Sequence, residues 1–222
     1  LHENAHVWIE WKLFFENLGY KCHTPSYPYH EGIPSELRQN PNRLLRKVGL
    51  NEVIDYYKNY IKGLSDKTPI LVGHSMGGLI VQKLMQFDMG ALGVCITSAS
   101  PKGVMSFKWS FIKSNIGVIN PFKFNSLYCG TKDWFHYAIC NTMTRRQSDE
   151  IYDLAVVPES RNIPRSSRFN DGKIDFKKPH KPLLFIGAEK DHIIPISLVK
   201  KNVKAYKHTD SITEFKEFRG KA

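Results

Sequence analysis

The stretch Gly73–Gly78 (GHSMGG) sets a serine among glycines, and Ser75 is the candidate nucleophile of the chain. A serine hydroxyl becomes reactive when a base removes its proton and a sharp turn presents its oxygen. The apolar residues 69–72 predict a strand that runs straight into this turn, and residues 76–87 predict a helix that leaves it. A strand, a glycine-rich turn and a helix in this order are typical of an enzyme that forms a covalent intermediate on serine.

The residues around the serine have predicted roles of their own. Gly73 and Gly77 occupy positions that are expected to require small residues, because larger side chains would crowd the strained turn. Met76 opens the predicted helix, so its backbone N–H is a candidate donor to a substrate oxyanion. His74 is expected to pack or hydrogen-bond beside the turn and is not assigned as the base.

The wider chain alternates between strand-like and helix-like segments, which predicts βα units and a mostly parallel sheet with helices on its faces. The predicted helices cover residues 7–18, 50–63, 76–87 and 195–206. The predicted strands cover residues 20–25, 69–72, 92–97, 182–187 and 213–218. Asn51 is expected to cap the second helix.

Residues 101–178 interrupt this alternation with an aromatic-rich stretch of short helical patterns and turns. We predict a core of residues 1–100 and 179–222, with 101–178 inserted as a mainly helical lid. The aromatic residues suggest either an apolar pocket over Ser75 or a small core belonging to the lid itself.

The GHSMGG turn resembles the nucleophile elbow of the α/β-hydrolase superfamily, and the similarity is greatest to its lidded esterase and lipase-like members. Residues 183–195 (LLFIGAEKDHIIP) are similar to the strand and loop that deliver the family's acid. Residues 20–32 resemble the strand and loop after the family's first helix, with Ser26 in place of the usual acidic residue. The resemblance implies a doubly wound parallel sheet and a serine carboxylester hydrolase that uses an acyl-enzyme and no cofactor or metal.

By this resemblance Asp191 is the acid of a catalytic triad, and Glu189 is the substitute candidate. The family's base follows the last strand, but the sequence continues from that strand only as Arg219–Ala222 and supplies no histidine there. We therefore expect a fragment whose histidine comes just past Ala222, and a natural pseudo-enzyme is the alternative. His192, beside Asp191, and His208, at the opposite end of the sheet, are weaker candidates.

Residues 1–4 (LHEN) resemble the end of the family strand that carries a His-Gly motif. In that comparison His2 matches the histidine, and the backbone N–H of Asn4 would be the second oxyanion donor. Glu3 replaces the glycine, and a carboxylate there would oppose an oxyanion unless it points away.

Composition limits the classes of partner. The chain has 222 residues and a net charge of +11, with lysines scattered rather than gathered in one block. This scatter predicts a solvated basic surface and no nucleic-acid site, although attraction of anionic lipids or acidic substrates is the other interpretation. No apolar stretch approaches the roughly 20 residues that span a bilayer, so no stable membrane insertion is expected.

The four cysteines, at positions 22, 95, 129 and 140, form no C-x-x-C pair. Free thiols in a reducing compartment are predicted, hence a cytoplasmic protein, with a Cys129–Cys140 disulfide as the alternative. The expected partner is a small ester with an apolar acyl or aromatic part. The competing functions are other serine-dependent reactions of this fold, on C–C bonds, thioesters or peracids, and a non-catalytic ligand-binding or scaffold protein.

Overall fold

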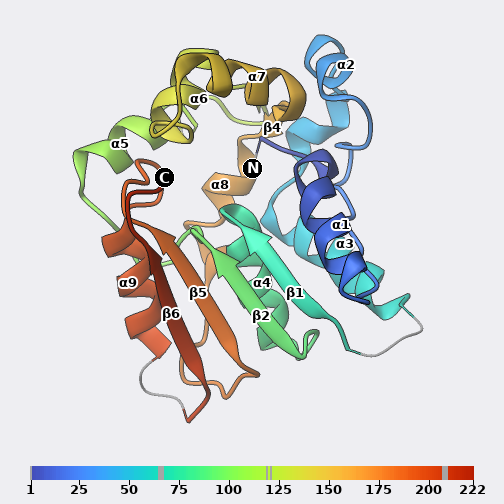
Figure 1. The fold of residues 1–222 in the computed structure, drawn as a ribbon, viewed down its shortest axis with the longest axis vertical. Coiled ribbons are helices and arrows are strands. Elements are labelled where there is room, and N and C mark those ends of the chain that lie inside the picture. The colour runs from blue at the N-terminus through green and yellow to red at the C-terminus, as the bar shows by residue number, and fades with distance from the viewer. Residues whose placement is uncertain (1, 65–67, 119, 121, 207–209) are drawn as a thin grey trace.

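The computed structural model describes residues 2–64, 68–118, 120, 122–206 and 210–222. Within these residues the main sheet has four strands in the order β1-β2-β5-β6, and all neighbouring pairs are parallel (Figure 1). The strands are β1 (Ile70–His74), β2 (Leu92–Ile96), β5 (Leu183–Ala188) and β6 (Thr213–Phe218). This arrangement confirms the predicted α/β fold with a mostly parallel sheet.

One face of the sheet is covered by helices. These are α3 (Leu50–Lys62), α4 (Met76–Gln86) and α9 (Ile196–Ala205). Cys95 and Phe185 are paired in register on this face and are fully buried, together with Leu79 of α4 and Leu198 of α9. Apolar side chains at alternate strand positions and at helical spacing therefore build one continuous core.

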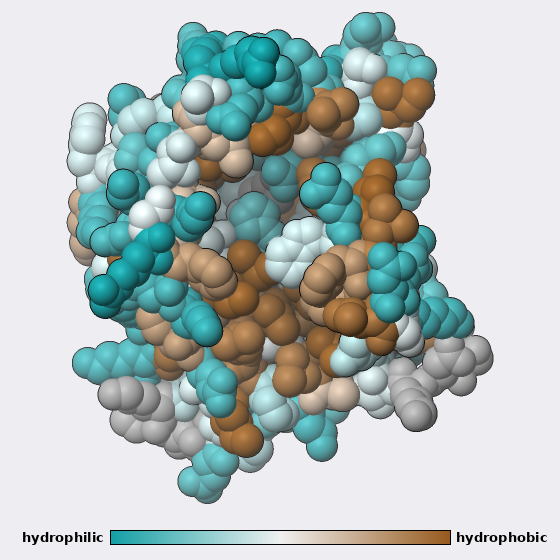
Figure 2. All heavy atoms as spheres, viewed as in Figure 1, coloured by the Kyte–Doolittle hydropathy of each residue, from teal (hydrophilic) through white to brown (hydrophobic). Residues whose placement is uncertain are grey.

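The opposite face is more open. Its side chains alternate with the buried ones, so Val94 and Leu184 are paired in register there and are only partly buried. Helix α1 (Ile9–Asn17) lies near the β1 edge, where Val72 remains 39% exposed. Figure 2 shows the resulting apolar surface below the centre of the molecule. Parallel sheets are usually covered on both faces, so this exposure is unusual.

The strand predicted over residues 20–25 does not form. This segment is in none of the strands, and no described strand pairs with β1 on its outer edge. Contacts to α3 hold it instead: the Tyr57 hydroxyl donates to the Pro25 carbonyl at 2.9 Å, and His23 Nδ1 lies 3.0 Å from Tyr60 Oη. A strand-like composition is not enough without a neighbouring strand to supply hydrogen bonds.

Helix α3 begins at Leu50 as predicted, but its N-cap lies two residues before the predicted one. Gly49 rather than Asn51 caps the helix, and the Gly49 N–H donates to the Glu52 carboxylate at 3.0 Å. The Asn51 side chain instead donates to Asp171 at 2.8 Å.

The chain between β2 and β5 forms several short elements above the carboxyl ends of the strands (Figure 1). These are α5 (Trp109–Asn115), β3 (Leu127–Tyr128), α6 (Lys132–Ala138), α7 (Arg145–Ala155), β4 (Glu159–Ser160), α8 (Asn162–Ser166) and η3 (Asn170–Gly172). Strands β3 and β4 form a separate antiparallel pair, while α8 and η3 pack on α3. The exact division of the chain at residues 101 and 178 stays a prediction.

The remaining described elements lie before α3. They are η1 (Ala5–Trp8), α2 (Pro34–Gln39) and η2 (Arg43–Lys47). A bridge between Glu3 and Val156 ties the start of the chain to the end of α7, beside the upper helices.

Candidate active site

Ser75 occupies a strained turn between β1 and α4. Its φ of 55° lies in the left-handed region, which a residue with a Cβ adopts only when its surroundings enforce it. The Ser75 N–H donates to the Ile96 carbonyl at 2.9 Å, and the Ser75 carbonyl accepts from the Ala99 N–H at 2.8 Å. The segment around the end of β2 therefore holds the turn in place from the side.

The crowding predicted for the two glycines of this turn is present at Gly73 and absent at Gly77. A Cβ on Gly73 would lie 2.2 Å from the Gly77 carbonyl oxygen, so position 73 accepts no larger residue without movement. Gly77 itself faces open space, which makes the prediction of crowding at that position wrong. The second close approach is at Gly78, where a Cβ would lie 2.7 Å from Ser98 Cβ.

Beside this turn is a cavity of about 440 Å³. Figure 2 shows the molecule hollowed between the sheet and the helices above it. Ser75 and Met76 lie on its wall, as does Asp191 from the loop after β5. Most of the remaining wall is apolar and includes Phe111, Val118, Phe135, Ile139, Ile151, Ile193 and Ile194.

The Asp191 carboxylate is fixed by its own loop. Its Oδ1 accepts from the N–H groups of Ile193 at 2.8 Å and Ile194 at 2.7 Å. Burial raises the pKa of Asp191 to about 6, and these hydrogen bonds together with the charge of His74 oppose the rise. The side chain is thus a partly desolvated acid on the cavity wall, beside the helices that cover the site.

One of the weaker candidate bases, His192, is not brought to this wall. His192 Nδ1 lies 2.9 Å from the Tyr137 carbonyl, its Nε2 lies 3.4 Å from Asn141 Nδ2, and its ring packs on Tyr137. His192 therefore faces α6 and is absent from the cavity wall. His208 lies outside the described residues.

The residues after β6 do reach the cavity. Lys221 and Ala222 lie on its wall, and the Lys221 carbonyl accepts from the Lys190 N–H at 2.8 Å. Glu189 accepts from the Gly220 N–H at 2.8 Å, so its carboxylate ties this loop to the one that carries Asp191.

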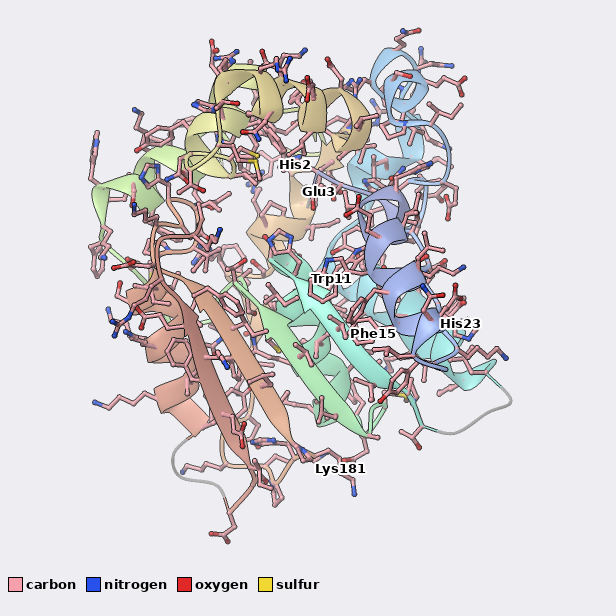
Figure 3. All side chains as sticks on the ribbon, viewed as in Figure 1. His2, Glu3, Trp11, Phe15, His23 and Lys181 are labelled. Carbon is pink, nitrogen blue, oxygen red and sulfur yellow. The ribbon has the colours of Figure 1, made fainter. Side chains whose placement is uncertain are left out.

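Glu3 and His74 form a pair that sequence reasoning did not predict. Glu3 Oε2 lies 3.6 Å from His74 Nδ1, and both residues line the cavity. Figure 3 labels Glu3 beside His2 at the start of the chain. Burial raises the pKa of Glu3, but the hydrogen bond and charge of His74 outweigh burial and leave it below its usual value. The Glu3 carboxylate therefore has His74 as its partner, and the expected conflict between Glu3 and an oxyanion stays a prediction.

The other residues of the first segment are placed differently. His2 lies on the cavity wall, packed edge-on against Tyr128 and Trp134, and burial lowers its pKa well below the usual value. The Asn4 side chain donates to the carbonyls of His30 and Gly32, both at 3.0 Å. Asn4 is not among the wall residues, so its role as an oxyanion donor stays a prediction.

The aromatic residues of the insertion divide into two groups. Phe111 and Phe135 are buried and line the cavity, and Phe135 also belongs to a small second core with Cys140 and Val156. In contrast Phe122 is 90% exposed. Both interpretations of the aromatic stretch therefore hold, and Phe135 satisfies both.

Arg168, just after α8, is a further wall residue that the sequence did not predict. It lies on the cavity wall, partly buried, with its guanidinium carbon 5.4 Å from the centre of the Phe111 ring. Burial lowers the pKa of this guanidinium. No periodic or motif signal marks it, because its place depends on how α8 packs back toward the sheet.

Cys22, Cys95, Cys129 and Cys140 are free thiols, so the alternative Cys129–Cys140 disulfide is not formed. In the described part of the chain, no three His, Cys, Asp or Glu side chains are grouped to hold a metal ion. The same residues include no helix with the length and apolar character needed to span a bilayer.

Comparisons with known proteins agree with this geometry. Solved structures with the same fold include an extracellular alpha/beta-hydrolase from a Paenibacillus species, with 22% identity, a TM-score of 0.71 and coverage of 99% of this chain and 86% of that one. The methylesterase MES16 from Arabidopsis has 12% identity, a TM-score of 0.68 and coverage of 98% of this chain and 86% of that one. The Paleococcus ferrophilus monoacylglycerol lipase has 16% identity, a TM-score of 0.66 and coverage of 99% of this chain and 81% of that one. No curated protein sequence matched. The model of the "Alpha/beta hydrolase family" matches residues 4–213, and the chain therefore belongs to that family.

Proposed function

We propose that this protein is a serine hydrolase that cleaves carboxylic esters through an acyl-enzyme. The observation that carries the proposal is the strained Ser75, presented on the wall of an apolar cavity that also exposes Asp191. The solved esterases and lipase with this fold support the same class of reaction.

In the proposed reaction Ser75 Oγ attacks the ester carbonyl carbon, and its proton passes to a base. The base returns this proton to the departing alcohol as the carbon–oxygen bond breaks, which leaves the acyl group on Ser75. Water then attacks the acyl-enzyme, and the carboxylic acid is released.

The carbonyl oxygen becomes an oxyanion during both steps and needs donors. The Met76 N–H supports this role because the first N–H groups of a helix have no acceptor within it, and α4 begins at Met76. The Asn4 N–H is the second donor in this proposal.

Asp191 would orient the base and stabilise its charged form. In the family that the chain resembles, this base is a histidine in the loop after the last strand, which is β6 here. The approach of Lys221 and Ala222 to the cavity supports that position. The apolar wall supports a substrate with an apolar acyl or aromatic part, and the free thiols support a cytoplasmic location.

The experiment measures release of 4-nitrophenol from 4-nitrophenyl butyrate by the full-length wild-type protein and by its Ser75→Ala variant, with Ser100→Ala as a matched control on the same wall. The wild type and Ser100→Ala should show a burst of one 4-nitrophenol per active site, with butyryl attached to Ser75 by mass spectrometry. Turnover that persists in Ser75→Ala would overturn the proposal.

A further inference from the structure

Arg168 is a partly buried cation on the cavity wall, and no acid among the described residues neutralises it. Among the described residues, its guanidinium forms no hydrogen bond or ion pair, and its one side-chain interaction is with the Phe111 ring. Partial burial of a cation without a counter-charge is unfavourable. An anionic ligand would therefore stabilise Arg168 by supplying the missing counter-charge.

The acids of the cavity and its surroundings already have partners. Glu3 pairs with His74, and Asp191 accepts two backbone N–H groups. Asp171, three residues after Arg168, accepts from the Asn51 side chain at 2.8 Å. None of these three carboxylates compensates Arg168.

The position of Arg168 is fixed relative to Ser75 by the backbone. The Ala99 N–H donates to the Ser75 carbonyl at 2.8 Å, and three residues later the Lys102 N–H donates to the Gly172 carbonyl at 2.9 Å. The segment that carries Arg168 is thus tied to the segment that supports the nucleophile. Both side chains face the same cavity.

We infer that Arg168 binds a carboxylate on the substrate, so that the preferred esters are half-esters of dicarboxylic acids with an apolar spacer. This inference deepens the proposed function and rests on it. A guanidinium offers two parallel N–H donors that match a carboxylate, and no described residue accepts from those of Arg168.

A carboxylate fits better than a phosphate because the charges balance. The other basic groups on the wall are His2, which burial keeps neutral, His74, which pairs with Glu3, and the exposed Lys221. One guanidinium neutralises a monoanion, whereas a phosphate dianion would keep an unpaired charge among Phe111, Val118 and Ile193.

The test compares monomethyl adipate with dimethyl adipate, which differ in one carboxylate and share the apolar spacer. For the wild type we expect kcat/KM for the half-ester to exceed that for the diester by about tenfold, the effect of one hydrogen-bonded charge pair. Arg168→Gln should remove this preference, and Arg168→Lys should restore part of it. Arg165→Gln is the matched control, because Arg165 is on α8 with its guanidinium over Phe124 and is not a wall residue.

The second arm measures binding of the same two compounds to Ser75→Ala protein by calorimetry, without turnover. About tenfold tighter binding of the half-ester, lost in Ser75→Ala/Arg168→Gln, supports the role of Arg168 even if no ester is hydrolysed. Equal binding of the two compounds, or a preference that survives Arg168→Gln, would overturn it while leaving ester hydrolysis untouched.

Discussion

A Cβ atom on Gly73 would lie 2.2 Å from the carbonyl oxygen of Gly77, on the far side of the turn that holds Ser75. The backbone on the two sides of the nucleophile is therefore in van der Waals contact. This contact closes the turn that carries Ser75, which lies on the cavity wall.

Gly73→Ala should destabilise the protein, because the methyl group can be accommodated only by opening the turn. We expect a loss of about 1–3 kcal/mol in the free energy of unfolding, measured by urea denaturation. Gly77→Ala is the control: its Cβ meets no atom within 4 Å, and alanine favours the helix. Equal losses for both substitutions would contradict the geometry of the turn.

Asp191→Asn should separate stability from activity. The amide oxygen can still accept from Ile193 and Ile194 N–H, while the variant loses the negative charge that orients the base. We expect kcat to fall by about 10⁴-fold and kcat/KM of the wild type to fall as pH drops below about 6, where Asp191 takes up a proton.

The stability of Asp191→Asn has a predicted pH dependence. The folded pKa of about 6 exceeds the unfolded value, so the folded wild type binds the proton more tightly and loses stability as pH rises through this window. The variant should therefore be at least as stable as the wild type at pH 8, and its advantage should shrink on acidification to pH 4. Thermal unfolding at each pH measures this, and an advantage that grows on acidification would contradict it.

Glu3→Gln should remove the ionised partner of His74. Because the folded pKa of Glu3 is lowered, its contribution to stability is present above the unfolded pKa and is lost as pH falls through the folded value. Wild type should thus unfold at a higher temperature than Glu3→Gln at pH 6, and the two should converge toward pH 3. A difference in unfolding temperature that widened in acid would contradict the lowered pKa of Glu3.

The two aromatic groups of the insertion should respond differently to truncation. Phe135 is fully buried and touches both the cavity and the second core, so Phe135→Ala should cost about 3–5 kcal/mol. Phe122 is 90% exposed, and Phe122→Ala should change the free energy of unfolding by less than about 0.5 kcal/mol. Urea denaturation measures the loss in free energy of unfolding for both variants. Similar losses would contradict the contrast between buried Phe135 and exposed Phe122.

The regular part of the fold was predictable because its signals are local. The apolar run before Gly73 and the amphipathic pattern of residues 50–63 predict β1 and α3 to within a few residues. The exception is the segment 20–25, whose composition suits a strand. Strand formation depends on a partner, and no described strand pairs with this segment.

The site was predictable where one short motif carries it. Ser75 and Asp191 follow strands, and parallel strands end on the same side of a sheet, so their presence on one wall follows from the topology. The Glu3–His74 pair and the contact of Arg168 with Phe111 join segments that are far apart in the sequence. Their contacts depend on how the start of the chain and α8 pack, which no local pattern encodes.

The central claim, that Ser75 is the nucleophile, is tested most directly by labelling with a fluorophosphonate followed by peptide mass spectrometry. The account predicts one phosphonate per chain, on Ser75, with no labelling of Ser75→Ala and undiminished labelling of Ser100→Ala. Labelling of Ser75→Ala at the wild-type rate, or a phosphonate found on another serine of the wild type, would contradict it.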